Sequence, residues 1–567
     1  MSTSDPSGPA GLSAVEGIKA RSHGLRGTLR ESLTDPRTGA IAPDDTALLK
    51  FHGSYQQDDR DTREERRQQK LEPDYSFMIR TRLPGGVCTP AQWLALDDLA
   101  GRYGNGTLRL TTRQAFQLHG VIKEDLRPTI AAMNAALIDT IAACGDVNRN
   151  VICNPDPDAS ALHAQVFPIA VALSEHLLPR TRAYHEIWLG EERVAGGEPE
   201  PEPGEPILGA TYLPRKFKIA IAVPPSNDVD VFAHDLGFIA LTDPDAPDRL
   251  IGFDVTVGGG MGATHGDPST YPRLATVIGA CTPAQVRAVA EHVVGIQRDH
   301  GDRRERKHAR LKCTLDRMGV PWFQDELARR LGAPLAPARP VTFDHTGDRF
   351  GWARRADGTW RVTLHLDSGR VADDETPGGP RTRTGLRELA RRVACELRLT
   401  PNQNLVVTGL ADGDRAAVDA LLAEHGLDGF RTRRSARLHA LACVALPTCG
   451  LAMAEAERAL PAFADRVDDL LAAHGLADLR LHLRITGCPN GCARPYLAEV
   501  ALVGKGPGRY NLMLGGDHAG DRLARLAREN VDEATALAHL DGLFATFARE
   551  RAAGEAFGAW YARTATA

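Results

Sequence analysis

The stretch Thr107–Val121, TLRLTTRQAFQLHGV, is repeated in altered form at Glu396–Leu410, ELRLTPNQNLVVTGL. The two segments align at an offset of 289 residues, which places Leu108 on Leu397. Six positions are identical across the pair: Leu108, Arg109, Leu110, Thr111, Gln114 and Gly120. The offset is far too long for a solenoid repeat and indicates two homologous halves instead.

Further matches keep the same order along both halves. Cys153 lies 290 residues before Cys443. Strictly alternating segments at Phe217–Val223 and Leu479–Ile485 each predict a strand with one buried face. A chance likeness between β-rich segments would not preserve this order, so we predict that the halves pack about a pseudo-two-fold axis.

Helices are predicted between these strands. Leu451–Leu460 is rich in Ala, Glu, Met and Leu, and we expect this helix to end at Pro461. Ala462–His474 has apolar residues at helical spacing, and Gly475 is expected to end it. Strands and helices are interleaved without regular βαβ units, which predicts the α+β class.

The composition is that of a globular protein with several domains. The chain has 567 residues, too many for one hydrophobic core, so about three to five units are expected. A net charge of −5 gives no general signal for binding nucleic acid or an anionic membrane. No apolar run reaches the ~18 residues that span a bilayer, and no secretory signal is apparent, so we expect a cytoplasmic protein.

Three polar segments are expected at the surface. Residues 1–50 are predicted to form a loosely held arm. The charge-dense stretch Gln56–Lys70 is interpreted as a solvated helix face in preference to a partner-docking site. Glu198–Pro206 (EPEPEPGEP) is interpreted as a surface linker or loop.

Four of the ten cysteines are clustered in the last third of the chain. Their pattern is C-x5-C at Cys443 and Cys449, then C-x3-C at Cys488 and Cys492. Four thiolates on loops can bind a [4Fe–4S] cluster, and Pro, Asn and Gly in CPNGC favour such a loop. Structural zinc is the main alternative, but it prefers shorter spacings and often uses His. The other six cysteines are expected to be buried small hydrophobes.

These residues give the chain a specific resemblance to a known family. The segments ACVALPTCGLAMAEAERALP (442–461) and TGCPNGCARPYLAEVALVG (486–504) carry it, with RLPGGV (82–87), NRNV (148–151), HLLPRTRAYHEIWL (176–189), LPRKFK (213–218) and GPGRYNL (506–512). The chain resembles the haemoprotein (beta) subunits of assimilatory sulfite reductases, in the sirohaem–[4Fe–4S] nitrite/sulfite reductase family. The resemblance spans roughly residues 20 to 560.

The resemblance implies an α+β fold of two pseudo-symmetric halves, each with a ferredoxin-like half-domain and a mixed α/β domain of the sirohaem/[4Fe–4S] type. The expected boundaries are an N-terminal arm at 1–65, half-domain 1 at 66–137, a sirohaem and substrate domain without a cluster at 138–338, half-domain 2 at 339–415 and a cluster domain at 416–567. Only the second half would therefore hold the cluster.

The resemblance also implies the roles of individual residues. Cys443, Cys449, Cys488 and Cys492 would bind the [4Fe–4S] cluster, and the Cys492 sulfur would also bind the sirohaem iron. Sulfite would be surrounded by Arg80, Arg149, Lys216 and Lys218. The sirohaem carboxylates would be contacted by Arg109, Arg113, Gln117 and His119, which share one face if their segment is continuously extended.

The implied activity is the six-electron reduction of sulfite to sulfide for cysteine biosynthesis. Because the chain has no credible flavin or nicotinamide fingerprint, electrons must come from another protein. A flavoprotein alpha subunit with FAD and FMN, oxidising NADPH, is favoured over ferredoxin. Two alternatives remain open, a sirohaem nitrite reductase that forms ammonia and a non-catalytic iron–sulfur electron carrier.

Overall fold

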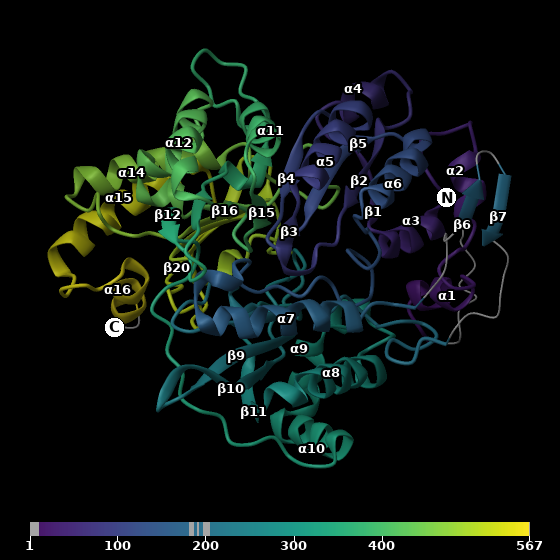
Figure 1. The fold of residues 1–567 in the computed structure, drawn as a ribbon, viewed down its shortest axis with the longest axis horizontal. Helices are drawn as coiled ribbons and strands as arrows, with labels where there is room; N and C mark the ends of the chain where they lie inside the picture. The colour runs from purple at the N-terminus through teal and green to yellow at the C-terminus, as the bar shows by residue number, and fades with distance from the viewer. Residues whose placement is uncertain (1–10, 181–185, 190–191, 197–203, 566–567) are drawn as a thin grey trace.

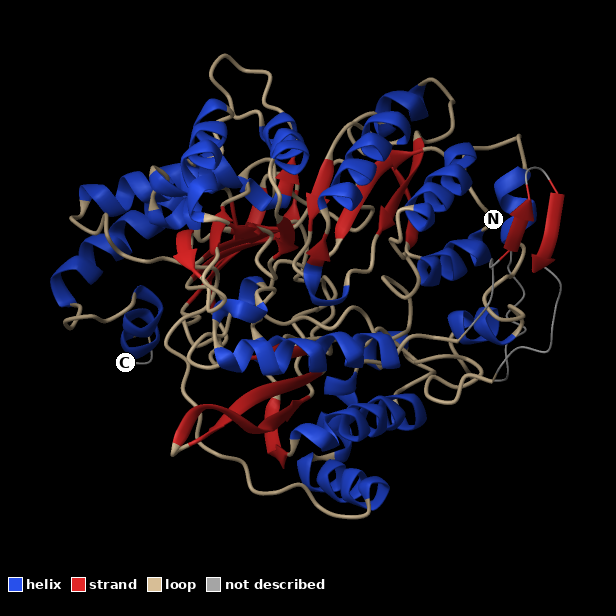
Figure 2. Ribbon diagram, in the orientation of Figure 1, coloured by secondary structure: helices blue, strands red, loops and turns tan. Residues whose placement is uncertain are grey.

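The computed structural model describes residues 11–180, 186–189, 192–196 and 204–565. Two five-stranded sheets dominate its upper part in Figure 1, with helices on their outer side (Figure 2). The first contains β1 (Ser54–Asp58), β2 (Tyr75–Arg80), β5 (Phe116–Val121), β4 (Leu108–Leu110) and β14 (Arg370–Val371). The second contains β12 (Gly351–Arg354), β13 (Trp360–Leu364), β16 (Leu405–Leu410), β15 (Glu396–Leu399) and β3 (Val87–Cys88).

Each of these sheets takes one strand from the other half of the chain. Strand β14 pairs with β4, with Arg370 opposite Arg109, while β3 pairs with β15, with Val87 opposite Arg398. The covering helices are α5 (Pro90–Tyr103), α6 (Leu126–Ala135), α11 (Thr382–Arg392) and α12 (Arg415–Glu424), and α5 packs on α11. The short helix α4 (Arg63–Gln68) has no buried residue. This reciprocal exchange confirms the predicted pseudo-two-fold relation between the halves.

The repeated stretch forms the same hairpin twice. The turn residues Gln114 and Gln403 both adopt left-handed backbone, with φ of 50° and 67°. Gly86 and Gly369 precede the two exchanged strands and also have positive φ, 71° in each case. A Cβ atom would lie 2.6 Å from the Leu399 carbonyl oxygen at Gly86, and 2.3 Å from the Leu110 carbonyl oxygen at Gly369. Both positions therefore require glycine for the same reason.

Two further sheets follow a second shared plan. One contains β8 (Ile219–Ala222), β9 (Leu236–Asp243), β10 (Ala246–Val257) and β11 (Thr276–Cys281). The other contains β17 (Leu441–Ala442), β18 (Leu483–Thr486), β19 (Val500–Gly506), β20 (Arg509–Leu514) and β21 (Arg525–Val531). In each, a parallel pair is followed by two antiparallel steps. The α+β class with two related halves is confirmed.

Helices surround both of these sheets. In the first half they are α7 (Ala161–His176), α8 (Val286–His300), α9 (Leu311–Met318) and α10 (Val320–Leu331). In the second they are α13 (Ser435–Leu438), α14 (Leu460–Ala473), α15 (Glu533–Glu550) and α16 (Phe557–Thr564). A small hairpin pairs β6 (Glu186–Leu189) with β7 (Glu192–Gly196). Among the described helices, none combines the length and apolar character needed to cross a membrane.

The N-terminal prediction is wrong for residues 11–50. They form α1 (Ala14–Ala20), α2 (Leu29–Thr34) and α3 (Pro43–Leu49), with Leu25 and Leu48 at most 2% exposed. The buried Lys19 ammonium donates a 2.9 Å hydrogen bond to the Leu213 carbonyl oxygen. These apolar and polar anchors hold the segment against the body of the protein, although its composition resembles that of a free arm.

Other predicted elements begin at a different residue in the structure or do not form. The helix predicted at Leu451–Leu460 is wrong, because that segment forms turns, and Pro461 lies in the first turn of α14 instead of ending a helix. Proline is tolerated there because the first helical N–H groups have no partner within the helix. The predicted strand at Leu479–Ile485 begins only at Leu483. Much of the predicted linker Glu198–Pro206 lies outside the described residues.

Candidate functional site

The four clustered cysteines lie on two loops at the ends of adjacent parallel strands. Cys443 follows β17 and Cys488 follows β18, so both loops leave the same edge of the sheet. The Gly487 N–H donates to the Cys443 sulfur at 3.2 Å. The Met453 N–H donates to the Gly487 carbonyl oxygen at 2.7 Å, which fastens the first loop to the second. A Cβ atom on Gly487 would lie 2.7 Å from that of Ala445, so glycine permits this approach.

The spread of the sulfur atoms argues against a single zinc ion. No three of the four cysteine sulfurs, all of them in the described part of the chain, lie within 4.8 Å of one another. Thiolates around one zinc would be about 3.8 Å apart at the usual Zn–S distance. The arrangement therefore leaves room for a cluster of several iron atoms.

The four thiols also form one electrostatic group. Burial raises the pKa of the thiols of Cys443, Cys449 and Cys488 to about 11, and the negative charge of Cys492 adds to each shift. Such thiols are protonated at neutral pH unless a metal replaces the proton. Cys492 differs from the others because its side chain is exposed.

The first half of the chain contacts the cluster loops directly. The Ala263 N–H donates to the Pro489 carbonyl oxygen at 2.9 Å. A Cβ atom on Gly491 would lie 3.0 Å from the Met261 carbonyl oxygen, and Gly491 has a φ of 64°. The CPNGC loop thus fits closely against the segment Gly258–Ala263.

The predicted substrate cations gather beside Cys492. Phe217 is fully buried while Lys216 and Lys218 are half-buried on the opposite face, as the predicted alternation requires. The predicted strand is shorter than expected, since β8 begins at Ile219, although Phe217 forms a bridge to Asn148. The charge of Cys492 acts on Arg80, Lys216 and Lys218, which places all three cations near its sulfur.

Burial, and after it the neighbouring positive charges, lower the pKa of both lysines. Burial lowers the pKa of Lys216 to about 7, and Arg215, Arg310 and Arg149 add to the shift. Burial also places the pKa of Lys218 well below its usual value, with Arg113 and Lys216 the next largest causes. Such a group of cations favours an anionic occupant.

Arg80 and Arg149 complete this group without carboxylate partners among the described residues. Arg80 donates to the Cys144 sulfur at 3.1 Å, and its guanidinium lies 5.9 Å from the Tyr55 ring centre. Arg149 donates to the Gly145 carbonyl oxygen at 2.8 Å. We call Arg80, Arg149, Lys216 and Lys218 the cation cage.

The four residues predicted to contact sirohaem do not share one extended segment. A turn separates β4 from β5, and Arg109 lies opposite Gln117 in the resulting hairpin. Arg113 lies in the turn, where it donates to the Asn150 carbonyl oxygen at 2.7 Å. The prediction of a single extended segment is wrong because Gln114 adopts left-handed backbone and reverses the chain.

The same hairpin nevertheless brings these residues to the cation cage. Gln117 lies opposite Arg80 on the neighbouring strand β2, and its amide oxygen can accept from that guanidinium. Arg109 is paired with Glu457 at 2.7 Å. His119 is 1% exposed, and its Nε2 atom has no hydrogen-bond partner within the described residues.

These donors fit a carboxylate-rich tetrapyrrole. Arginine donates hydrogen bonds to carboxylates in paired geometry and keeps its charge when buried. An orphaned buried imidazole nitrogen such as His119 Nε2 indicates a missing polar partner. The donor set therefore suits sirohaem, with Cys492 as the one of the four clustered cysteines whose charge acts on the cage.

Several residues at this site were missed by sequence reasoning. Arg215 could have been noticed because it directly precedes Lys216 in LPRKFK. Tyr55, Cys144 and Arg310 carried no local signal, because none of them lies in a recognisable motif, although Cys144 is only five residues before Arg149. Arg310 pairs with the buried Asp235 at 2.8 Å, and its charge acts on both cage lysines.

Family comparisons agree with this architecture. A sequence model described as the nitrite and sulphite reductase 4Fe-4S domain matches residues 171–335, in the half without the four cysteines. A second, described as the nitrite/sulfite reductase ferredoxin-like half domain, matches residues 68–136 and 353–425. These two matched segments contain the strands of the two interlocked sheets except β1 and the beginning of β12.

Full-length relatives are similar along nearly the whole chain. A Myxococcus xanthus protein named sulfite reductase (NADPH) hemoprotein beta-component is 66% identical over 555 residues, covering 98% of this chain and 97% of the relative. A Geobacillus kaustophilus protein of the same name is 55% identical, with 98% and 95% covered. The solved structure of Mycobacterium tuberculosis NirA has a TM-score of 0.78 at 25% identity, with 97% and 96% covered. The chain therefore belongs to the nitrite and sulfite reductase family.

Proposed function

We propose that the chain is the haemoprotein subunit of an assimilatory sulfite reductase, which supplies sulfide for cysteine biosynthesis. The observation that carries this proposal is the cation cage next to Cys492, the exposed member of the four-cysteine group. The names of the relatives from Myxococcus xanthus and Geobacillus kaustophilus support sulfite as the substrate.

The proposed cofactors are a [4Fe–4S] cluster and sirohaem. Cys443, Cys449, Cys488 and Cys492 would hold the cluster, and Cys492 would also hold the sirohaem iron. Together the cofactors supply single electrons and an iron atom that binds the sulfur of sulfite. The sirohaem carboxylates would be held by Arg109, Arg113, Gln117 and His119, as their donors and location near the cage suggest.

The protein's own contribution is to bind the anion and deliver protons. Sulfite takes up six electrons and seven protons to give hydrosulfide and three water molecules. Arg80 and Arg149 stay charged and donate hydrogen bonds to the substrate oxygens as negative charge develops on them. Lys216, whose pKa is lowered to about 7, is suited to give a proton to a leaving oxygen and regain one from water.

The proposed electron donor is a flavoprotein partner that oxidises NADPH. The relatives' name, hemoprotein beta-component, implies another component, and ferredoxin is the alternative donor. All ten cysteines are free thiols in the structure, as expected in a reducing compartment, so we place the enzyme in the cytoplasm.

Absorption spectra and kinetics test the function. The purified protein should show sirohaem and iron–sulfur bands together, and a larger kcat/KM for sulfite than for nitrite with an artificial reductant. A cluster without sirohaem would indicate an electron carrier, and a preference for nitrite would identify a nitrite reductase. Supplying NADPH with the flavoprotein, or reduced ferredoxin, then identifies the donor.

A further inference from the structure

The second half of the chain has a counterpart to the cation cage. Ile219 lies opposite Leu236 in the parallel pair β8–β9, and Leu483 lies opposite Val500 in β18–β19, so the two pairs have the same register. Lys218 directly precedes β8 and His482 directly precedes β18. His482 therefore occupies the position that Lys218 has in the first half.

A buried carboxylate binds the backbone at both positions. The Lys218 N–H donates to Asp235 Oδ2 at 3.0 Å, and the His482 N–H donates to Glu499 Oε2 at 3.0 Å. In the first half the carboxylate is paired with Arg310. In the second half the partner is an imidazole, because His518 Nε2 lies 2.8 Å from Glu499 Oε2. The second half thus has the imidazoles of His482 and His518 where the first half has the cations of Lys218 and Arg310, on the same backbone arrangement.

The three side chains form a compact set of metal-binding atoms. One ligand atom each from His482, Glu499 and His518 all lie within 4.8 Å of one another. His482 Nδ1 is 3.8 Å and His518 Nε2 is 2.8 Å from Glu499 Oε2. Ligand atoms around a tetrahedral zinc ion would be about 3.3 Å apart, midway between these two distances.

An independent observation comes from the imidazole of His482. This residue is 2% exposed, yet neither ring nitrogen has a hydrogen-bond partner in the described part of the chain. Buried polar atoms are almost always paired, so two orphaned nitrogens on one ring indicate an occupant that the protein atoms alone do not supply. A metal ion at Nδ1 would account for the first of them.

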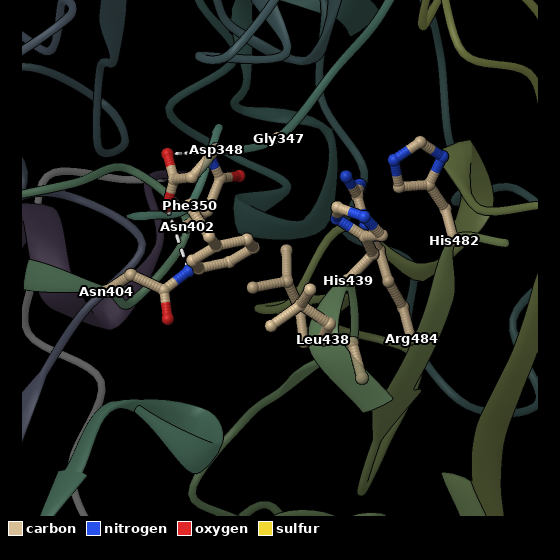
Figure 3. A pocket seen from close by; sticks show the side chains of 11 residues that line it. Gly347, Asp348, Phe350, Asn402, Asn404, Leu438, His439, His482 and Arg484 are labelled. Atoms are coloured by element: carbon tan, nitrogen blue, oxygen red, sulfur yellow. Dashed lines mark hydrogen bonds between the residues drawn. The ribbon is translucent and has the colours of Figure 1, made fainter. Parts of the chain in front are cut away.

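The second nitrogen faces a small cavity. A Cβ atom on Gly347 would lie 3.8 Å from His482 Nε2. The adjacent cavity of about 10 Å³ is close to the smallest space that holds one water molecule. Figure 3 shows His482 beside His439 and Arg484, with Asp348 and Asn404 across the cavity. A water there could accept from Nε2–H, as the outer nitrogen of a metal-bound imidazole requires.

The surrounding charges permit a divalent ion. Glu499 supplies one negative charge, and its other oxygen accepts from the Gly558 N–H at 2.9 Å. Arg480 and Asp517 both act electrostatically on His518 with opposite signs. Arg480 and Arg484 both act on His482, and the charge of Arg484 is offset by Asp230, which lies 2.8 Å away.

We infer that His482, Glu499 and His518 bind a Zn²⁺ ion, with water as a fourth ligand. Two imidazoles and one carboxylate are a common ligand set for this ion. The ion would connect β18 and β19 with the loop after β20, and through Glu499 with the first turn of α16. It lies apart from the four cysteines and has no part in the proposed reduction of sulfite.

Zinc binding to the holoenzyme tests this inference. The protein is treated with a chelator, dialysed, and titrated with Zn²⁺ alone against a chromophoric competitor, for the wild type, His518→Gln and His474→Gln. His474 is a matched control because it is also a partly exposed histidine paired with a carboxylate, Asp541, away from this site. We expect one tightly bound zinc in the wild type and the control, and an affinity at least ~100-fold lower in His518→Gln.

Equal zinc affinity in His518→Gln and the wild type, or no tight site in the wild type, would overturn the inference. Unchanged iron content and cofactor absorbance in each variant establish that it is folded. If His518→Gln does not fold, X-ray absorption at the zinc edge of the wild type decides. Two imidazoles and oxygen ligands support the site, whereas sulfur ligands refute it.

Discussion

The two halves share a backbone plan but hold different side chains at equivalent positions. Before β8 the first half has Lys218, part of a group of cations that suits an anion, and before β18 the second half has His482. The cluster cysteines occur only in the second half, on the loops that follow β17 and β18. The shared scaffold therefore fixes where chemistry can occur, while individual side chains decide which chemistry occurs there.

Replacing Cys492 should have the largest effect. Cys492→Ser is expected to lose both the iron–sulfur and sirohaem absorption and all sulfite turnover, because this sulfur is proposed to hold both cofactors. Spectra and activity with an artificial reductant measure this. Cys153→Ser, at the first-half position aligned with Cys443, should keep both cofactors. Normal spectra in Cys492→Ser would refute the bridging role.

Asp230 joins the halves through a buried ion pair with two arginines. It lies 2.8 Å from Arg484 and 2.5 Å from Arg494, both in the second half. Asp230→Asn should lower the free energy of unfolding by about 3–5 kcal/mol, because it leaves two buried cations poorly compensated. Denaturant unfolding measures this, and Asp243→Asn, whose single partner arginine Arg249 is 66% exposed, should shift the midpoint far less.

The contribution of Asp230 to the free energy of unfolding also has a defined pH dependence. Burial raises the pKa of this carboxyl, but Arg484 and Arg494 outweigh burial and hold it below 3.8. Its stabilisation is therefore fully present above pH about 4 and is lost as the pH falls through the lowered folded-state value. If the Asn variant and the wild type differ equally at pH 3 and pH 7, this linkage is wrong.

Replacing a residue of the cation cage should reduce sulfite turnover, whereas replacing the residue at the equivalent position in the second half should not. Lys216→Met should reduce kcat/KM for sulfite by about 10²–10³-fold, the usual effect of removing one donor to developing negative charge. Arg480→Met, at the corresponding position before β18, should change it only slightly. Steady-state kinetics on cofactor-loaded protein compare the two variants. An equal loss of kcat/KM in both would mean that both halves serve the reaction.

The smallest effect is expected at the two exchanged strands, and it should be symmetric. Gly86→Ala and Gly369→Ala should each cost about 1–3 kcal/mol of stability, because both residues have φ of 71° and abut a carbonyl oxygen. Gly413→Ala, which meets no atom within 4 Å, should stay within about 1 kcal/mol of the wild type. Unequal costs at Gly86 and Gly369 would weaken the claim that the exchange is reciprocal.

Much of the fold and site followed from local pattern. The 289-residue offset predicted two halves, and each repeated stretch forms the same hairpin. The alternation of Lys216, Phe217 and Lys218 predicted which side chains would lie on one face. Local pattern was misleading where Pro461 begins a helix and where Gln114 reverses the chain, since both signals depend on the conformation of neighbouring residues.

The sequence alone determined the spacing of the four cysteines, the repeat and the residue types of the cage, because these are properties of short segments. Only the tertiary structure decided that Arg80 and Lys218 lie near Cys492, that each sheet includes a strand from the other half, and that Glu499 lies between two histidines. Such contacts join residues far apart along the chain. They depend on how whole sheets pack against one another, which no local sequence pattern specifies.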